Sequence, residues 1–207
     1  MAGTWMRLAI CSAALLLATG AAAGPDPKAE SCADCHGKDG VSTHAEVPTI
    51  AGVSAFTIED HMLAFRSGED RPCRAFEFQG GDHPKGAKDD MCAIAKHLSE
   101  ADVKDLAAHF AGVRFAPFAQ PSDAAEAAVG AKVHKTACEK CHSAGGSDPA
   151  DDAGILAGQP REYLERSFKD FRAGKRVMDE KMAPKVKALT DAEVEALVEF
   201  YAHGGKP

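Results

Sequence analysis

Aromatic residues are scarce in this sequence, at 6% of 207 residues, and no stretch alternates apolar and polar residues convincingly. The first absence leaves little large apolar material for a core built from side chains alone. The second excludes a β-sheet as the main architecture. The Gly-x-Gly-x-x-Gly fingerprint is absent as well, so a dinucleotide-binding domain of that kind is not expected on this chain.

Long hydrophobic runs are also missing. The one candidate, Leu8–Ala18, is too short to span a membrane. Arg7 precedes this run, and the small residues Ala21–Ala23 follow it, which is the pattern of a secretory signal peptide. We therefore expect residues 1–23 to be removed near Ala23 and Gly24 and the mature chain to be exported, in a bacterium to the periplasm.

Basic residues are fewer than acidic ones. The formal net charge is −7, and it becomes −8 once Arg7 leaves with the signal peptide. This balance argues against nucleic acid as a partner.

The cysteines that are present are informative, because the pattern Cys-x-x-Cys-His occurs twice, at Cys32–His36 and at Cys138–His142. This pentapeptide is the attachment signature of c-type haem. Its two thiols form thioethers with the porphyrin, and the histidine offers a nitrogen to the iron. Two copies favour two covalently bound haem c groups over a pair of redox or zinc sites, and each porphyrin would supply the apolar centre that the aromatics do not.

The two halves of the chain are a tandem repeat. A shift of 106 residues superposes the two pentapeptides and maps Phe65–Gly68 onto Phe171–Gly174. Beyond that point a shift of 91 maps Met91 onto Met182, so the first half carries 15 more residues between Gly68 and Met91. We expect an all-α protein with domains at 24–114 and 128–207, joined by a linker at 115–127.

Each half has the same predicted helices. A short helix leads into the haem motif, and later helices are expected where the apolar periodicity is helical, at Thr57–Ser67, Ser99–Ala111, Arg161–Ala173 and Thr190–Ala202. Ser99 and Thr190 are favourable N-caps, each followed three positions later by a carboxylate.

The sixth iron ligand follows from the repeat. His36 and His142 are the predicted proximal ligands, and the corresponding methionines Met91 and Met182 are the predicted sixth ligands. A thioether occupies the position that oxygen or peroxide would need and favours ferrous iron, so His/Met iron carries electrons. Two other methionines compete. Met178 has no methionine counterpart in the first half, and Met62 fits packing at a haem edge.

Cys73 and Cys92 remain once the pentapeptides and Cys11 of the signal peptide are set aside. They lie at the two ends of the inserted segment, and in an oxidising compartment we favour a disulfide that would hold Met91 near the iron. Free thiols and a metal site that includes His83 stay open as alternatives.

The remaining polar clusters carry weaker signals. Six further histidines lack ligand-like spacing and are expected at the surface or at interfaces: His44, His61, His97, His109, His134 and His203. A basic cluster brackets Met182 and is either a solvated loop or a docking rim for an acidic partner: Lys175, Arg176, Lys181, Lys185 and Lys187.

With these motifs the chain resembles a two-haem class I cytochrome c, and the second half is most similar to the cytochrome subunit of flavocytochrome c sulfide dehydrogenase. The residues that carry this similarity are Gly130–His134, Cys138–His142, Ile155–Gln159, Asp170–Arg172 and Met178–Ala183. The resemblance implies two tandem class I domains, each wrapped around one haem c. In class I cytochromes a backbone carbonyl orients the proximal histidine. Pro48 is placed to provide it, whereas the second half has Gly154 and Ile155 there.

The resemblance also implies partners. An FAD-containing sulfide dehydrogenase subunit would reduce the haems, and a soluble monohaem cytochrome would accept the electrons, so this chain would be a non-catalytic electron-transfer subunit. One alternative is a free-standing dihaem shuttle to a terminal oxidase. Another is a small haem enzyme, a peroxidase or a thiosulfate dehydrogenase, which would need an open or cysteine-ligated iron.

Overall fold

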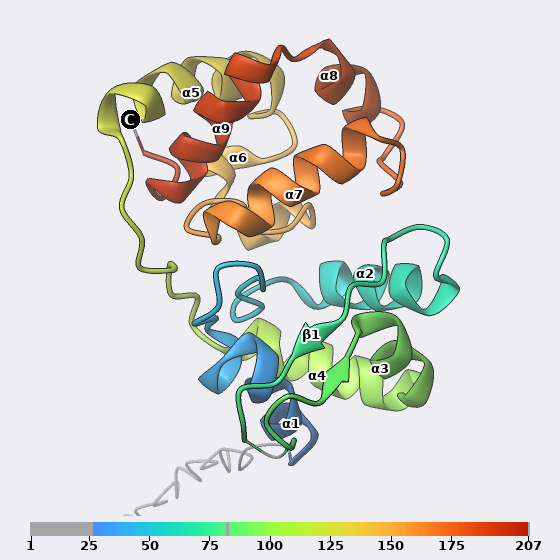
Figure 1. Ribbon diagram of the computed structural model, residues 1–207. Coiled ribbons are helices and arrows are strands. Elements are labelled where there is room, and N and C mark those ends of the chain that lie inside the picture. Colours follow the sequence, from blue (N-terminus) through green and yellow to red (C-terminus); the bar gives the residue numbers. More distant parts are fainter. Residues whose placement is uncertain (1–26, 82, 207) are drawn as a thin grey trace, which may run out of the picture.

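The structure is a computed structural model that describes residues 27–81 and 83–206, and the predicted signal peptide lies outside these residues. The chain forms two helical halves stacked on each other and joined by one extended segment (Figure 1). The first half contains α1 (Pro27–His36), α2 (Ala55–Ser67), α3 (Met91–His97), α4 (Glu100–Gly112) and a 3-10 turn at Lys38–Gly40. The second contains α5 (Ala124–Ala137), α6 (Ser143–Gly146), α7 (Arg161–Arg172), α8 (Met182–Ala188), α9 (Asp191–Ala202) and a 3-10 turn at Pro149–Asp151. Among these described helices none is both long and apolar enough to cross a membrane.

Helices α4 and α9, the closing helices of the two halves, begin where the sequence predicts. Ser99 caps α4 and Thr190 caps α9, and in each case the side chain accepts the backbone N–H three residues on, from Asp102 and Glu193. The two carboxylates accept the backbone N–H of their capping residues in return, which completes a capping box. The buried face of each helix then points into its own half, and it includes Leu106 and Phe110 in α4 and Leu197 and Tyr201 in α9.

The second half has the larger side-chain core. Its buried cluster combines residues of α7 and α9 with Leu189 between them, and Leu197 is fully buried. Helix α5 crosses α9 at Gly130, where a Cβ atom would lie 2.0 Å from the carbonyl oxygen of Ala196, so glycine is needed for this close approach. The buried cluster of the first half is smaller and consists of Ala29, Leu106 and Phe110.

The inserted segment forms a hairpin that the sequence does not predict. Strands β1 (Phe76–Glu77) and β2 (Lys88–Asp89) pair antiparallel, with Phe76 opposite Asp89. With two residues in each strand, the hairpin is too short to leave an alternating pattern. A disulfide joins Cys73 to Cys92 with the Cα atoms 5.5 Å apart, which confirms the favoured pairing and closes the segment at its base.

The connection between the halves is an extended segment that ends at helix α5. Helix α5 already begins at Ala124, because the side chain of Asp123 accepts the N–H groups of Ala125 and Glu126. The segment before it is extended and hydrogen-bonds to the second half, where Phe118 N–H donates to Gly158 O at 2.8 Å.

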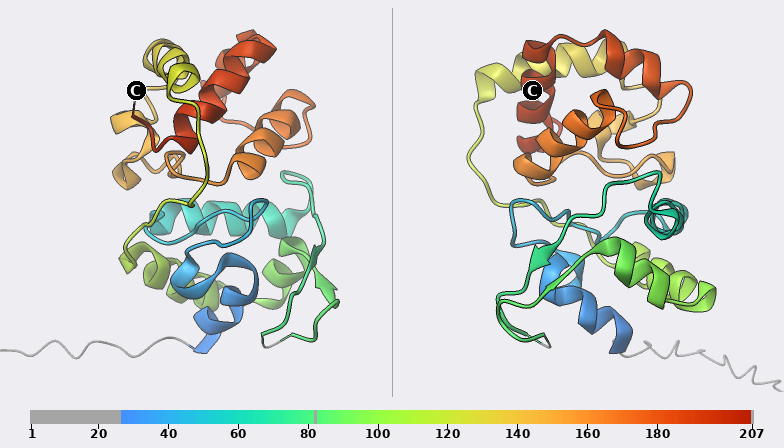
Figure 2. Two further views of the ribbon diagram at one scale, coloured as in Figure 1. Left: turned by 60° about the vertical axis from the view of Figure 1, so that its left-hand side comes forward. Right: turned by 45° about the vertical axis from the view of Figure 1, so that its right-hand side comes forward.

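The halves meet where α2 faces α7 (Figures 1 and 2). Backbone hydrogen bonds join them, from Tyr163 N–H to Ala45 O at 3.2 Å and from Val177 N–H to Asp70 O at 3.0 Å. An ion pair joins Arg74 to Asp170 at 2.6 Å, and the Asp170 side chain is 9% exposed. These contacts set how the two pentapeptides lie relative to each other.

Candidate haem-attachment sites

The first pentapeptide ends helix α1. Cys32 and Cys35 are three residues apart in this helix, which brings their side chains to one face. His36 is 8% exposed, and its Nδ1 lies 2.9 Å from the carbonyl oxygen of Pro48, the acceptor that the sequence predicts. Nδ1 therefore donates to Pro48, and Nε2 is left for a ligand. Burial lowers the pKa of His36 and keeps the imidazole neutral, which is the form that binds a metal.

The second pentapeptide follows helix α5 as a turn. The N–H groups of Cys141 and His142 both donate to Cys138 O at 3.0 Å, which brings the two cysteines and the histidine together. The Nδ1 atom of His142 is buried and has no hydrogen-bond partner among the described residues. The repeat places Gly154 where the first half has Pro48, so the two histidines are held differently, as the sequence suggests.

The residues of both pentapeptides fit covalent haem. None of the four cysteines is in a disulfide, although Cys73 and Cys92 are bonded to each other. Burial raises the pKa of Cys35 to about 11, with Asp34 as the next contribution, and burial also raises the pKa of Cys138. Burial lowers the pKa of His142, so both halves offer two thiols and a neutral imidazole. This donor set suits thioether attachment and iron ligation.

The predicted methionine ligands occupy equivalent positions. Met91 is the first residue of α3 and Met182 is the first residue of α8, and each helix has seven residues. Both side chains are half-buried. In the first half the position is fixed further, because Asp90 caps α3 and the disulfide holds Cys92 next to Met91. Met178 is also half-buried but precedes α8 in a loop, and Met62 lies within α2.

His83 does not contribute to a metal site with Cys73 and Cys92. Its Nδ1 lies 2.7 Å from Oδ2 of Asp34, and its ring stacks on Phe78 with the centroids 4.0 Å apart. Cys73 and Cys92 lie near Asp90, but their sulfurs are used in the disulfide. The alternative metal site with His83 is therefore wrong.

His134 is not a surface residue, contrary to the expectation from sequence. Its side chain is 2% exposed, and its Nδ1 forms a 2.9 Å hydrogen bond with the hydroxyl of Tyr201. Its Nε2 lies 2.5 Å from a carboxylate oxygen of Glu139, inside the second pentapeptide. Comparison of the two halves could have indicated this contact. The first half has Lys28, Ala33 and Phe110 at the corresponding positions, so only the second half has the imidazole, the carboxylate and the hydroxyl together.

A cationic cluster lies where the halves meet. Arg71 is 8% exposed, and its Nη1 has no partner among the described residues. Its guanidinium carbon lies 4.5 Å from the centroid of Phe65, and that of Arg176 lies 4.3 Å from the centroid of Phe171. Phe65 and Phe171 are counterparts in the repeat, so each half contributes one arginine stacked on one phenylalanine.

The charges of these two arginines lower the pKa values of Tyr163 and His61. Burial alone would raise the pKa of Tyr163, but Arg176 and Arg71 outweigh it and lower the pKa to about 7. Burial, followed by the same two charges, lowers the pKa of His61 well below its ordinary value. The two guanidinium groups therefore favour an anion at this place.

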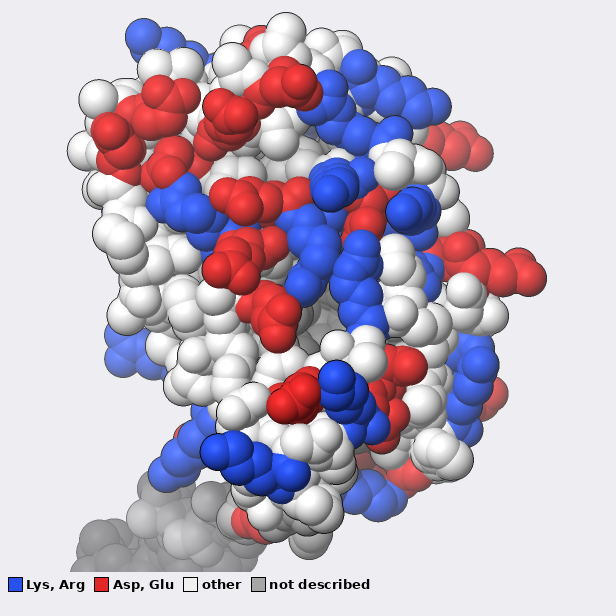
Figure 3. Space-filling view, in the orientation of Figure 1, with Lys and Arg blue, Asp and Glu red and all other residues white. Residues whose placement is uncertain are grey.

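Only part of the predicted basic cluster forms an exposed rim. Lys175, Lys181, Lys185 and Lys187 are exposed, whereas Arg176 turns inward over Phe171 and donates to Ser167 Oγ at 3.1 Å. In the space-filling view, basic side chains gather toward the end of the second half that carries α8, and acidic side chains gather over α5 (Figure 3).

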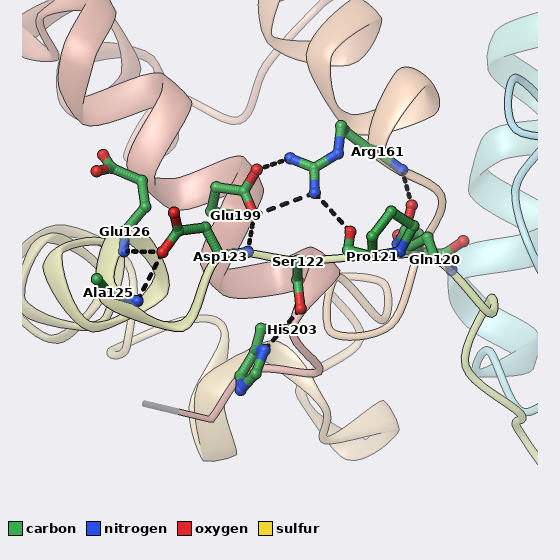
Figure 4. A network of polar contacts seen from close by, with 10 residues as sticks. Gln120, Pro121, Ser122, Asp123, Ala125, Glu126, Arg161, Glu199 and His203 are labelled. Atoms are coloured by element: carbon green, nitrogen blue, oxygen red, sulfur yellow. Dashed lines mark hydrogen bonds and ion pairs between the residues drawn. The ribbon is translucent and has the colours of Figure 1, made fainter.

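A surface hollow between α7 and α9 does not belong to this chemistry. It has a volume of about 850 Å³, and none of the eight predicted site residues lines it. At its edge Arg161 forms an ion pair with Glu199 and donates to Pro121 O at 2.9 Å (Figure 4). Ser122 Oγ is hydrogen-bonded to His203 Nδ1 at 2.7 Å, so this network fastens the connecting segment to α9.

The helical fold and the two pentapeptides, each of which ends in a histidine, define the class of protein as a two-domain c-type cytochrome. Residues 125–200 match the family model described as cytochrome c oxidase, cbb3-type, subunit III. A "Thiosulfate dehydrogenase electron acceptor" from Stutzerimonas stutzeri is 30% identical over 88% of this chain and 83% of its own length. A "Cytochrome c4" from Pseudomonas aeruginosa is 31% identical over 78% of this chain and 76% of its own length.

Solved structures give the same result. Reduced cytochrome c4 from Pseudomonas stutzeri superposes with a TM-score of 0.67 at 26% identity, covering 86% of this chain and 94% of that one. A thiosulfate dehydrogenase from Marichromatium purpuratum also gives a TM-score of 0.67 at 26% identity, covering 83% of this chain but 36% of that one. The chain belongs to the cytochrome c4-like dihaem class I cytochromes c, and its function is electron transfer.

Proposed function

We propose that this chain carries one covalent haem c on each pentapeptide and passes electrons from a periplasmic dehydrogenase to a soluble acceptor cytochrome. Cys32 and Cys35 would hold the first haem, and Cys138 and Cys141 the second. His36 with Met91, and His142 with Met182, would ligate the two irons. The observation that carries the proposal is the duplicated donor set, with a neutral histidine beside two thiols that are not in disulfides.

Haem iron would supply one-electron redox chemistry in each half, and the protein groups would orient and tune it. Pro48 would hold the imidazole of His36 through its Nδ1–H. Arg71 and Arg176, with the hydroxyl of Tyr163, would hold haem propionates, because the Nη1 of Arg71 is a buried donor that needs an acceptor. Arg71 comes from the first half and Arg176 from the second, and both act on Tyr163, so these donors lie where the halves meet.

Two classes of electron donor have support. The name of the Stutzerimonas relative supports a thiosulfate dehydrogenase as the donor, and that relative aligns with most of this chain. The motifs of the second half, Ile155–Gln159 and Met178–Ala183, support the FAD-containing sulfide dehydrogenase subunit implied by the sequence resemblance. A free-standing shuttle is the remaining candidate, supported by the cytochromes c4 among the relatives. We place the thiosulfate dehydrogenase first.

Haem content and iron ligation test the core of the proposal. The purified protein should contain two haems c per chain in a pyridine haemochrome assay. Met182→Ala should abolish the methionine-to-iron charge-transfer absorption of one haem and preserve the other. Met178→Ala is the matched control and should leave both haems unchanged. One haem per chain, or two intact signals in Met182→Ala, would refute the assignment.

Co-purification from the native cells tests the donor. Recovery with a haem-containing dehydrogenase and haem reduction by thiosulfate would support the first candidate. A stoichiometric FAD protein with haem reduction by sulfide would support the second. A lone cytochrome that neither compound reduces would identify the free shuttle.

A further inference from the structure

The two pentapeptides differ in solvent exposure. Cys141 and Lys140 of the second are exposed, and His142 is half-buried. In the first, Cys35 is half-buried, His36 is buried, and the Asp34 side chain is 10% exposed. Thioether bonds would attach each haem to its cysteines, so the sulfurs would mark one edge of each porphyrin. That edge is therefore open in the second half and covered in the first.

The inserted segment provides the cover. Asp34, the central residue of the first pentapeptide, accepts the backbone N–H of His83 at 3.0 Å and faces His83 Nδ1 at 2.7 Å with the same oxygen. The ring of His83 stacks on Phe78, with an angle of 7° between the planes, and Phe78 is 2% exposed. The segment is thus packed onto the haem motif rather than extended into solvent.

The fit of this cover is close. Gly81 has a φ of +100°, and a Cβ atom there would lie 2.0 Å from Oδ1 of Asp34, so no other residue allows this approach without a shift. The disulfide holds the base of the segment, and the pairing of β1 with β2 holds its middle. No corresponding segment exists in the second half, where the repeat is 15 residues shorter.

The open edge in the second half is bordered by positive charge. Lys140 lies inside the pentapeptide and is exposed. Burial raises the pKa of Cys138, and the charge of Lys185 of α8 partly offsets this rise, so Lys185 lies close to that sulfur. The neighbouring Lys181 and Lys187 are exposed as well, while the nearby Glu139 is engaged with His134. A rim of this sign favours an acidic partner surface.

We propose that the inserted segment closes the thioether edge of the first haem to redox partners, so that an acidic redox protein exchanges electrons with this chain at the second haem, on the rim formed by Lys140 and Lys185. The inference rests on the proposed attachment of haem to both pentapeptides. Electrons would reach the first haem through the interface between the halves.

The solvent exposure of each haem in the oxidised holoprotein tests the cover independently of activity. It is measured in proton NMR as the broadening of the hyperfine-shifted haem methyl signals by an added neutral gadolinium chelate. The signals that change in Met182→Ala are assigned to the second haem. We expect several-fold stronger broadening of the second haem's methyl signals. His83→Ala should raise the broadening of the first haem, and so should the milder Asp34→Asn. Lys88→Ala, an exposed change in the same segment, should not.

Equal broadening of the two haems in the unmodified protein would overturn the inference. Unchanged first-haem broadening in both His83→Ala and Asp34→Asn would also overturn it, provided that both variants retain two haems. Failure to find two sets of haem signals at all would instead refute the proposed function, so the two failures are distinguishable.

Charge reversal tests the rim. The probe is the anion ferricyanide, and the reaction is oxidation of the reduced protein at low ionic strength, in which one electron passes from ferrous haem to ferricyanide. Lys140→Glu and Lys185→Glu should each slow it by about threefold or more, because they remove attraction near the open edge. Lys85→Glu, on the exposed turn of the inserted segment, should leave the rate within error. An equal slowing by Lys85→Glu would mean that the first haem is also open, and it would overturn the proposal.

Discussion

Gln159 of the second half and Thr49 of the first are joined by two hydrogen bonds between a side chain and a backbone. The Gln159 Oε1 accepts the Thr49 N–H, and its Nε2 donates to the Thr49 carbonyl, both at 2.9 Å. Both residues are nearly inaccessible, with 2% and 1% exposed. Because Thr49 follows Pro48, whose carbonyl orients His36, the second half helps to hold the histidine of the first.

Replacing this amide should destabilise the stacking of the halves. Gln159→Ala leaves the backbone N–H and carbonyl of Thr49 buried without partners, and we expect a loss of about 2–4 kcal/mol in the free energy of unfolding. Denaturant unfolding of the holoprotein measures this. Gln79→Ala is a matched control, because Gln79 is exposed and makes a local bond to Glu77 O. Equal stability of the two variants would show that the contact is dispensable.

The two proximal histidines should exchange their ring protons at different rates. The Nδ1–H of His36 is held by Pro48 O, whereas His142 Nδ1 has no such partner among the described residues. In proton NMR of the oxidised holoprotein we expect one slowly exchanging imidazole N–H signal and one fast one. The slow signal should belong to the first half. Two equally protected signals would contradict the difference seen here.

Removing the disulfide should weaken the first half selectively. In the chain-entropy model, opening a bridge between residues 19 apart costs about 3 kcal/mol. Cys73→Ser with Cys92→Ser should lower the unfolding free energy by about that amount. As denaturant is added, this double variant should lose the methionine-to-iron absorption of the first haem before that of the second, because Cys92 adjoins Met91. Loss of both absorptions together would show that the bridge supports the whole chain rather than one site.

Acid should release the capping box of α4. Hydrogen bonds from Lys28, and then from Ser99, lower the pKa of Asp102 to about 2. A carboxyl whose pKa is lowered by folding stabilises the folded chain at any pH above its pKa in the unfolded chain. This stabilisation is lost as the pH falls to its pKa in the folded chain, here between about pH 4 and pH 2. Asp102→Asn should flatten the stability profile across that range. Asp105→Asn, exposed on the same helix, should follow the unmodified protein.

Arg71 should raise the reduction potential of the haem whose propionate it would hold. A buried positive charge favours the ferrous form, which carries one charge less than the ferric form. Arg71→Met should therefore lower one of the two reduction potentials measured by spectroelectrochemical titration. Arg74→Met removes an arginine of the same interface that is paired with Asp170 and 40% exposed, so both potentials should change little. Equal shifts in the two variants would point to a general effect of charge.

Much of the fold could be predicted because its signals are local. Capping by Ser99 and Thr190 depends on residues three positions apart, and the closing helices begin as predicted. The repeat likewise predicts that Met91 and Met182 have equivalent positions, and the cysteine inventory predicts the Cys73–Cys92 bond. The hairpin at Phe76 was not predicted, because its strands are held by the disulfide and by packing rather than by their own pattern.

The chain's motifs by themselves determined its class, since two Cys-x-x-Cys-His pentapeptides bring thiols and imidazole together through local geometry alone. Contacts between distant residues decided the rest. Only the tertiary structure buries His134 against Tyr201, joins Gln159 to Thr49, and packs His83 onto Asp34. The residues of each pair lie tens of residues apart in the sequence. From sequence alone their polar side chains are predicted to be exposed, and only folding removes the water around them.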